Sequence, residues 1–258
     1  EYFQRLTKIG RRSFLRLLSF VGVAGIAFPK RSVASLLLTN SRVIIVTDSQ
    51  ATSGAVIDSP VVQVMVNRGI RSLAQITDVG EAWKSLLPGI SASSKIALKV
   101  NCLNSSCPTH PPVTNAVVET LKRMMFDGTP FAENNIIIFD RTQYELQGSG
   151  YTINTSTAGV RCFATSSSGV GYSTQNYNVN GSTQKLSRIV TEMCDYLINI
   201  SVLKNHGDGG VTLCLKNHYG TCDSPGNMHG GDCDPYIPAL NALQPISTKQ
   251  RVDIIDAL

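Results

Sequence analysis

Three lysines stand in short polar segments that each follow an apolar stretch of the chain. Lys99 lies two residues before Asn101, Lys204 two residues before His206, and Lys216 directly before Asn217. Ammonium groups beside glycine-rich backbone amides suit a carboxylate or a phosphate. We therefore predict a small anionic ligand over these segments. The predicted ligand-binding residues are Lys99, Asn101, His110, Lys216 and Asn217. The alternative is that each lysine extends to solvent or pairs with a nearby acid.

Two of these residues also suit proton transfer. A desolvated lysine can act as a base or as a Schiff-base nucleophile, and histidine titrates near neutral pH. We predict that Lys204 or His206 moves a proton if the protein is an enzyme, while Lys99 and Lys216 hold negative charge. Asp140 and Asp208 would assist as acids or as partners of these groups.

The chain has four histidines, and all fall in predicted loops. Histidine is the commonest metal ligand in proteins. His206 and His218 are twelve residues apart around a glycine-rich turn, so they could fold together, and His110 is the third candidate. We predict a possible transition-metal site from His206, His218 and His110. His229 lies in a second glycine-rich segment, for which we favour a loop without a functional role.

Seven cysteines are many for a chain of 258 residues. An exported protein can oxidise them, and an odd number leaves at least one thiol unpaired. The two pairs that we consider for disulfides are Cys102 with Cys107, and Cys222 with Cys233. A zinc site that mixes these cysteines with His110 or His229 is the alternative. Cys194 and Cys214 lie among apolar residues and are predicted to be buried.

The elements that must position these residues alternate between strands and helices. β-branched apolar runs predict strands, and apolar residues at helical spacing predict helices. The predicted strands are residues 42–47, 95–100, 135–140, 195–201 and 251–255, and the predicted helices are residues 61–76, 79–87, 113–126, 186–193 and 236–243. Ligands of open parallel sheets bind beyond the carboxyl ends of the strands. We expect one three-layer α/β domain over residues 40–258, with a mainly parallel sheet and a polar insertion at residues 141–184.

The basic charge belongs to the first part of the chain. Residues 1–31 hold seven basic residues and one acidic residue, or +6, and the whole chain carries +5, so the remainder carries −1. A nucleic acid partner would need clustered basic residues in the body, so we exclude one. Arg11-Arg12 before an apolar run, with Ser32-Val33-Ala34 after it, resembles a twin-arginine signal peptide over residues 1–34. This predicts export of a folded protein to the periplasm or cell surface by the twin-arginine machinery, with an uncleaved leader as a possible membrane tether.

Four separated motifs resemble the domain of unknown function 362 family. They are Lys99-Val100-Asn101, Thr109-His110-Pro111, Leu203-Lys204-Asn205-His206 and the segment from Thr212 to Gly220, and residues 252–258 resemble a late strand of that family. Members are often predicted to be exported, and some carry ferredoxin-like iron–sulfur segments. This chain has no Cys-x-x-Cys-x-x-Cys run, so an iron–sulfur cluster is not expected here. The domain is also distantly similar in fold to the N-terminal half of nickel-pincer lactate racemases.

Two functions of different classes follow from these observations. The first is an exported enzyme or binding domain for a small anionic molecule, with a possible metal. The second is a non-catalytic structural or redox-partner module that is held by the two disulfides. Because the chain lacks an initiating Met and stops just after a predicted strand, we expect it to be truncated at the C-terminus and to be a fragment.

Overall fold

The computed structural model describes residues 41–258. A five-stranded sheet forms the middle layer of these residues, and every pairing in it is parallel. Its strands, in the order in which they lie side by side, are β13 (Gln250–Asp256), β10 (Tyr196–Val202), β3 (Ile96–Lys99), β6 (Ile136–Phe139) and β7 (Arg161–Cys162). The predicted α/β fold with a mainly parallel sheet is confirmed.

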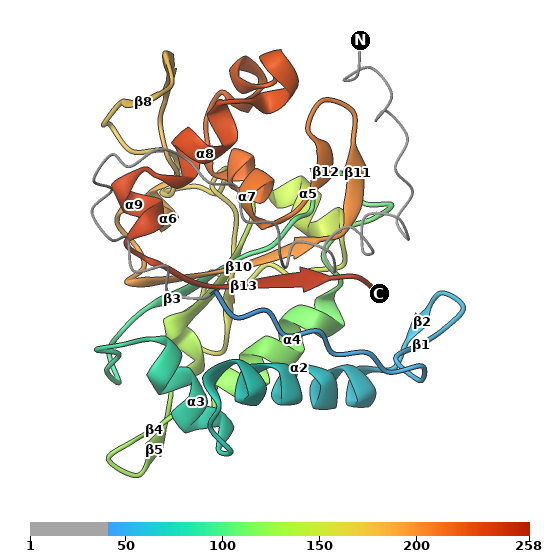
Figure 1. Ribbon diagram of the computed structural model, residues 1–258. Coiled ribbons are helices and arrows are strands. Elements are labelled where there is room, and N and C mark those ends of the chain that lie inside the picture. Colours follow the sequence, from blue (N-terminus) through green and yellow to red (C-terminus); the bar gives the residue numbers. More distant parts are fainter. Residues whose placement is uncertain (1–40) are drawn as a thin grey trace, which may run out of the picture. The chain divides into compact units, whose positions relative to one another are not determined.

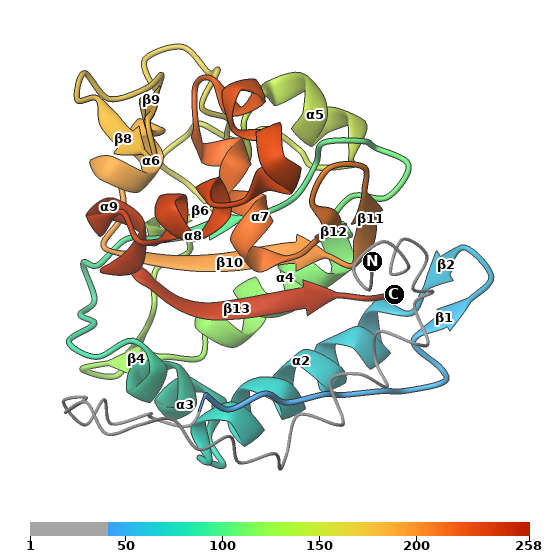
Figure 2. The same cartoon turned by 45° about the horizontal axis from the view of Figure 1, so that its top comes forward.

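Helices cover both faces of the sheet (Figures 1 and 2). One face carries α2 (Ser59–Ala74), α3 (Val79–Leu86) and α4 (Pro111–Leu121). The other carries α6 (Arg188–Thr191), α7 (Cys214–Asn217), α8 (Tyr236–Asn241) and α9 (Gln244–Ser247). None of the helices in residues 41–258 is long and apolar enough to cross a membrane. The predicted leader lies outside the described residues.

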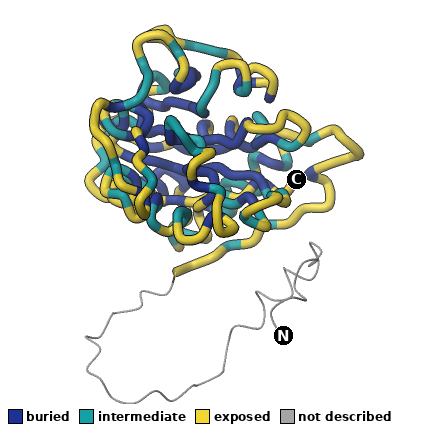
Figure 3. Tube along the Cα trace, turned by 90° about the horizontal axis from the view of Figure 1, so that it is seen from above, coloured by how far each residue is buried: buried dark blue, intermediate teal, exposed yellow. Residues whose placement is uncertain are grey.

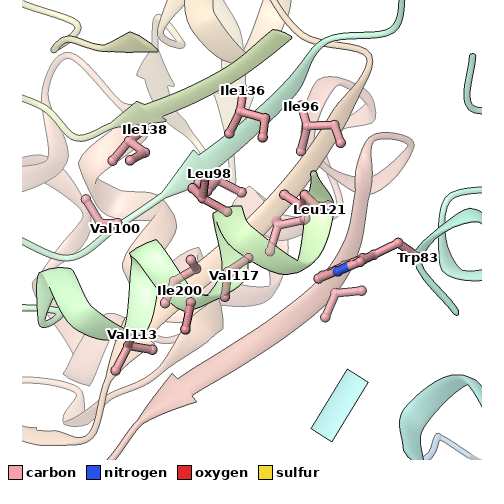
Figure 4. Close-up of a cluster of buried hydrophobic side chains, with 14 of the residues drawn as sticks. Trp83, Ile96, Leu98, Val100, Val113, Val117, Leu121, Ile136, Ile138 and Ile200 are labelled. Atoms are coloured by element: carbon pink, nitrogen blue, oxygen red, sulfur yellow. The ribbon is translucent and has the colours of Figure 1, made fainter. Parts of the chain in front are cut away.

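Two apolar cores follow from this layering. β3, β6 and β10 are buried along their whole length, which Figure 3 shows as dark blue segments inside an exposed shell. Successive side chains of a strand point to opposite faces. Leu98 and Ile136 therefore pack with α3 and α4 around Trp83 (Figure 4), whereas Ala97 and Ile137 belong to the core under α6, α8 and α9.

Local signals explain where the helices α2 and α3 begin. The side chain of Asp58 accepts a hydrogen bond from the backbone N–H of Val61, and Pro60 occupies the first turn of α2. Asp78 caps α3 in the same way through Glu81. Each cap satisfies a backbone N–H that has no partner within the helix. A Ser-Pro pair such as Ser59-Pro60 predicts a helix that Ser59 caps, but the cap of α2 is Asp58, one residue earlier.

The predicted strand at residues 42–47 is wrong. These residues form no helix or strand, and Val43 and Ile45 are 79% and 77% exposed. A β-branched run becomes a strand only where another strand can pair with it. Residues 42–47 pair with neither edge strand of the described sheet, β13 or β7.

One further prediction needs correction at its boundary. The helix expected at residues 113–126 ends at Leu121, and residues 125–130 form a hairpin of β4 (Met125–Phe126) and β5 (Thr129–Pro130). Asp127 and Gly128 in its turn both have positive φ, as a tight hairpin turn requires. Within the polar segment 141–184, β7 is the edge strand of the main sheet.

Smaller elements lie outside the main sheet and the helices that cover it. The segment 141–184 also contains α5 (Gln143–Gly148) and the hairpin of β8 (Tyr177–Val179) with β9 (Ser182–Gln184). Another hairpin, β1 (Thr52–Ser53) with β2 (Val56–Ile57), precedes α2. A fourth hairpin, β11 (Lys204–His206) with β12 (Gly210–Thr212), follows β10 directly and stands at the carboxyl end of the sheet (Figure 1). The sequence pattern did not predict this hairpin, yet it holds both predicted proton-transfer residues.

Candidate functional site

A buried ion pair occupies the carboxyl ends of β3 and β6. Nζ of Lys99 donates to Oδ1 of Asp140 at 2.6 Å, and the two side chains are 1% and 4% exposed. The same ammonium donates to the carbonyl of Val100 at 2.6 Å. Asp140 also accepts the backbone N–H groups of Cys102 and Arg141 at 2.6 and 2.7 Å. Both charges are thus compensated within the protein, as a buried pair requires.

Gly220 has a packing role beside this pair. A Cβ atom at Gly220 would lie 2.8 Å from Nζ of Lys99 and 3.0 Å from Oδ1 of Asp140. Carbon does not approach other heavy atoms so closely in proteins. The chain can pass over the ion pair only where it has no side chain.

Asparagines extend the ion pair into a network. Oδ1 of Asn217 accepts from Nδ2 of Asn101 at 3.0 Å and from Lys99 at 3.3 Å, and its Nδ2 donates to Oδ1 of Asn199 at 2.8 Å. All are buried. We call Lys99, Asp140, Asn101, Asn199 and Asn217 the buried network. The structure brings together three predicted ligand-binding residues here, but their polar atoms are engaged with one another.

Lys204 is also engaged by the protein. Its ammonium donates to Oδ1 of Asn101 at 2.8 Å and to the carbonyls of Leu103 and Cys107 at 2.7 and 2.9 Å. Its pKa is lowered, mainly by burial. An ammonium has three protons, and all three find acceptors. Lys204 therefore ties the loop after β3 to the hairpin and presents no free donor.

His110 and His218 lie in separate structural settings. The backbone N–H and Nδ1 of His110 both lie 2.8 Å from Oδ2 of Asp256, at the start of α4. His218 is fully buried, its Nε2 contacts Gln250 and Asn199, and burial lowers its pKa to about 4. Each ring contacts the end or edge of the sheet rather than His206. The structure does not bring the three predicted metal-binding histidines together.

A second group of side chains gathers under the β11–β12 hairpin. Nζ of Lys216 lies 3.2 Å from Nε2 of His229 and 3.4 Å from the centroid of the Tyr219 ring. The rings of His206 and His229 stack with centroids 5.5 Å apart. We call Lys216, His206, His229 and Tyr219 the hairpin cluster. His229, for which the sequence favoured no role, is its central member.

Hydrogen bonds define the protonation of both imidazoles. Nδ1 of His206 receives the backbone N–H groups of Asp208 and Gly209, each at 3.1 Å. A backbone N–H can only donate, so Nδ1 accepts and the proton of the neutral ring is on Nε2. An ammonium likewise only donates, so Nε2 of His229 accepts from Lys216 and Nδ1 carries the proton. The neutral cluster therefore presents N–H donors.

Burial lowers the pKa values of two basic groups of the hairpin cluster, Lys216 and His206. Lys216 is 7% exposed, and burial lowers its pKa to about 8. The pKa of His206 is lowered by burial and then by the nearby charge of Lys216. Both shifts disfavour the protonated forms, because burial removes water from the charged groups and the nearby Asp208 carboxylate opposes this effect only in part.

By distance alone, a small group at this place could hold a metal ion. Ligand atoms of His206, Asp208 and His229 lie within 4.8 Å of one another, and Asp208 is exposed. However, one nitrogen of each ring already accepts an N–H, and the Lys216 ammonium would repel a cation. These contacts favour an anion over a cation. A bound transition metal stays a prediction.

The seven cysteines, all within the described residues, are free thiols. Cys194 and Cys214 are buried, as predicted. Burial raises the pKa of Cys214 and of Cys222 to about 12, so these groups are thiols rather than reactive thiolates at neutral pH. The disulfides predicted for Cys102 with Cys107 and for Cys222 with Cys233 are not formed in this structure, and thiol counting in solution remains their test.

Sequence reasoning missed several members of both groups. Asn199 lies inside a buried strand, and Tyr219 and Gly220 are the last two residues of the motif from Thr212 to Gly220. The signal for Asn199 was a polar residue in the middle of an apolar run. No local signal marks Tyr219 or Gly220, because their roles depend on Lys216 and on the ion pair.

Comparison with known sequences identifies the domain that carries both groups. No curated protein sequence matches the chain. The family described as a domain of unknown function (DUF362) matches residues 96–255, which is more than half of the chain and contains every residue of the buried network and of the hairpin cluster. The chain therefore belongs to this family, whose description assigns it no activity.

Proposed function

We propose that the protein binds a small anionic ligand, a carboxylate or a phosphate, at the hairpin cluster. The carrying observation is that Lys216 is a buried ammonium whose nearest polar partner is a neutral imidazole. A buried charge is costly unless an opposite charge accompanies it. Lys99 has this counter-charge in Asp140. No carboxylate of the described residues forms an ion pair with Lys216, and only the exposed Asp208 lies near enough for its charge to act on it. A ligand carboxylate or phosphate would supply the missing ion-pair partner.

The donors around Lys216 support the same proposal. The neutral His206 ring carries its proton on Nε2 and the neutral His229 ring on Nδ1. Neither of these N–H groups has a hydrogen-bond partner among residues 41–258, since the bonds of both rings involve the other nitrogen. An anion bound here would receive hydrogen bonds from charged and neutral donors together, which is a strong combination.

Calorimetric titration of the full chain with oxalate and with inorganic phosphate tests this proposal. We expect one of them to bind, and Lys216→Met to weaken binding about 10-fold or more, since a charge-assisted hydrogen bond contributes about 1.5–3 kcal/mol. Lys185→Met is the matched control, because Lys185 is exposed and lies outside the cluster. Equal loss in both variants, or no binding of either anion, would contradict the proposal.

The uptake of protons on binding provides a second test. Because burial lowers the pKa of Lys216 to about 8, a bound anion must raise it and draw a proton from solution near pH 8. The heat of binding should then depend on the ionisation enthalpy of the buffer. The same protein titrated with Zn²⁺ or Ni²⁺ tests the metal prediction, for which proton release is expected instead.

We also propose that the protein is exported in folded form by the twin-arginine machinery. The paired arginines Arg11 and Arg12 and the cleavage pattern ending at Ala34 support this proposal. Replacing both arginines by lysine in the full chain, expressed with its own leader, should leave the protein in the cytoplasm of a bacterial host. Export of the variant at the rate of the unchanged chain would contradict it. The size of the exported protein would distinguish cleavage from a membrane tether.

A further inference from the structure

We infer that Lys216 is a nucleophilic amine that forms a Schiff base with a small carbonyl compound carrying a negative charge, such as a 2-oxo acid. This inference rests on the proposed function, because the carboxylate of such a compound would occupy the hairpin cluster. It goes further by naming a bond to the protein and a class of substrate.

The contacts of the three site lysines separate Lys216 from the others. Lys99 donates to a carboxylate, a carbonyl and an amide oxygen, and Lys204 donates to three oxygens. The N–H groups of these two amines are all engaged by oxygen acceptors, which holds the nitrogen away from a reacting carbonyl group. Lys216 instead contacts an aromatic ring face and one imidazole nitrogen. Imidazole is a base that can take the proton which the amine must lose.

The burial of Lys216 supplies the neutral amine. With a pKa of about 8 in place of 10.5, the neutral fraction at pH 7.5 is about 200-fold larger than for an ordinary lysine. Desolvation of a lysine in an apolar setting is a known way to activate it. The groups that face Lys216 are the Tyr219 ring, His229, the hairpin glycine Gly209 and Cys233. The exposed carboxylate of Asp208 is near enough to raise the pKa of Lys216, but it forms no ion pair with it and burial outweighs its charge.

His229 is placed to move the protons of the reaction. Nε2 of His229 takes a proton from the Lys216 ammonium across 3.2 Å, and the neutral amine adds to the carbonyl carbon. The resulting carbinolamine loses its hydroxyl group, to which the imidazolium returns the proton, and a C=N bond forms. The balance is amine plus carbonyl to imine plus water, and no oxidant or reductant is needed. His229 is thus a catalytic residue in this step.

The site suits a small acid better than a neutral carbonyl compound. A protonated imine is a cation in the place of the ammonium, and a carboxylate on the neighbouring carbon offsets its charge. The Nε2–H of His206, whose ring stacks on His229, is the donor available to that carboxylate. Gly209 leaves space beside Lys216 for the compound. A Cβ atom at this position would already lie in contact with Cε of Lys216, at 3.6 Å.

Reductive trapping tests the inference. The full chain is incubated at pH 7.5 with pyruvate and sodium cyanoborohydride, which reduces an imine to a stable secondary amine, and the modified lysine is located by mass spectrometry of peptides. We expect one 1-carboxyethyl group per chain on Lys216, formed about 10-fold or more faster than on any other lysine. Acetone, a neutral ketone of similar size, should give much less adduct.

Matched variants separate the possible results. Lys216→Arg retains the charge without the nucleophile and should abolish the adduct, whereas Lys185→Arg should retain it. His229→Gln should slow trapping even at a saturating concentration of pyruvate, because it removes the group that takes the proton from Lys216. Modification spread over exposed lysines, or an adduct that persists in Lys216→Arg, would overturn the inference.

Oxalate titration keeps this result apart from the proposed function. Oxalate cannot form the imine, so it reports anion binding alone. If the unchanged protein binds oxalate but gives no adduct with pyruvate on Lys216, the Schiff-base inference is overturned and the anion site stands. If neither oxalate binding nor an adduct is found, both are overturned.

Discussion

The buried network and the hairpin cluster each contain a buried lysine, but the surroundings of the two lysines differ. Lys99 and Lys216 are both buried, and Lys216 and Asn217 are neighbours in the four-residue helix α7. Yet Asn217 joins the network around the Lys99–Asp140 ion pair, whereas Lys216 faces His229 and Tyr219. In the network the two opposite charges form an ion pair, whereas the Lys216 ammonium of the cluster forms an ion pair with no carboxylate of the described residues and has the exposed Asp208 only nearby. Groups whose charges and hydrogen bonds are satisfied within the protein stabilise its fold. Groups with an unpaired charge or a free donor are available to bind a ligand or to react.

The largest effect is expected from breaking the network at its charge. Asp140→Ala leaves the Lys99 ammonium buried without a counter-ion, and such a change costs about 3–5 kcal/mol of unfolding free energy. Urea unfolding followed by circular dichroism measures it. Asp208→Ala, which removes an exposed carboxylate beside the cluster, should change stability by less than about 0.5 kcal/mol. Similar losses in the two variants would erase the distinction between the regions.

The next effect is a dependence of stability on pH. Burial lowers the pKa of His218 from its ordinary value of 6.5, which applies to the unfolded chain, to about 4 in the folded protein. Below pH 6.5 the unfolded state therefore binds more protons than the folded state. Stability is therefore full above pH 6.5 and falls by up to about 1.4 kcal/mol per pH unit between pH 6.5 and 4. Urea unfolding of the protein and of His218→Gln across this range isolates the contribution. Parallel curves would show that His218 is not buried in its neutral form.

Gly220 tests how tightly the network is packed. Gly220→Ala places a methyl group against Lys99 and Asp140 and should destabilise the protein by about 1–3 kcal/mol. Gly226→Ala is the control, because a Cβ there meets nothing within 4 Å. The two midpoints of thermal unfolding provide the comparison. Equal midpoints would mean that the chain can move away from the ion pair without cost.

The smallest and most discriminating comparison is between two lysines. Lys204→Met leaves three oxygen acceptors without a donor and should cost about 1–3 kcal/mol. Lys216→Met removes an ammonium that the protein does not neutralise, so stability should stay within about 0.5 kcal/mol or rise. Urea unfolding at pH 7 measures both. A larger loss for Lys216→Met than for Lys204→Met would assign a structural role to the cluster.

The main elements of the fold could be predicted because their signals are local. The strands containing Leu98, Ile137 and Ile198 read as continuous apolar runs, which is typical of a parallel sheet covered on both faces. The run at residues 42–47 has the same composition and forms no strand, since pairing depends on distant residues. The β11–β12 hairpin was missed for a related reason, because Lys204-Asn205-His206 has no alternation of apolar and polar residues.

The amino-acid sequence by itself determined the parallel α/β fold, the polar loops beyond its strands and the family, because periodicity and motif spacing are properties of short segments. It could place Lys99, Lys204 and Lys216 near one another but could not rank them. Only the tertiary structure decided that Asp140 neutralises Lys99, that backbone carbonyls engage Lys204 and that Lys216 faces His229. The reactivity of a lysine depends on its burial and on the acceptors around it, and these come from residues far away in the chain.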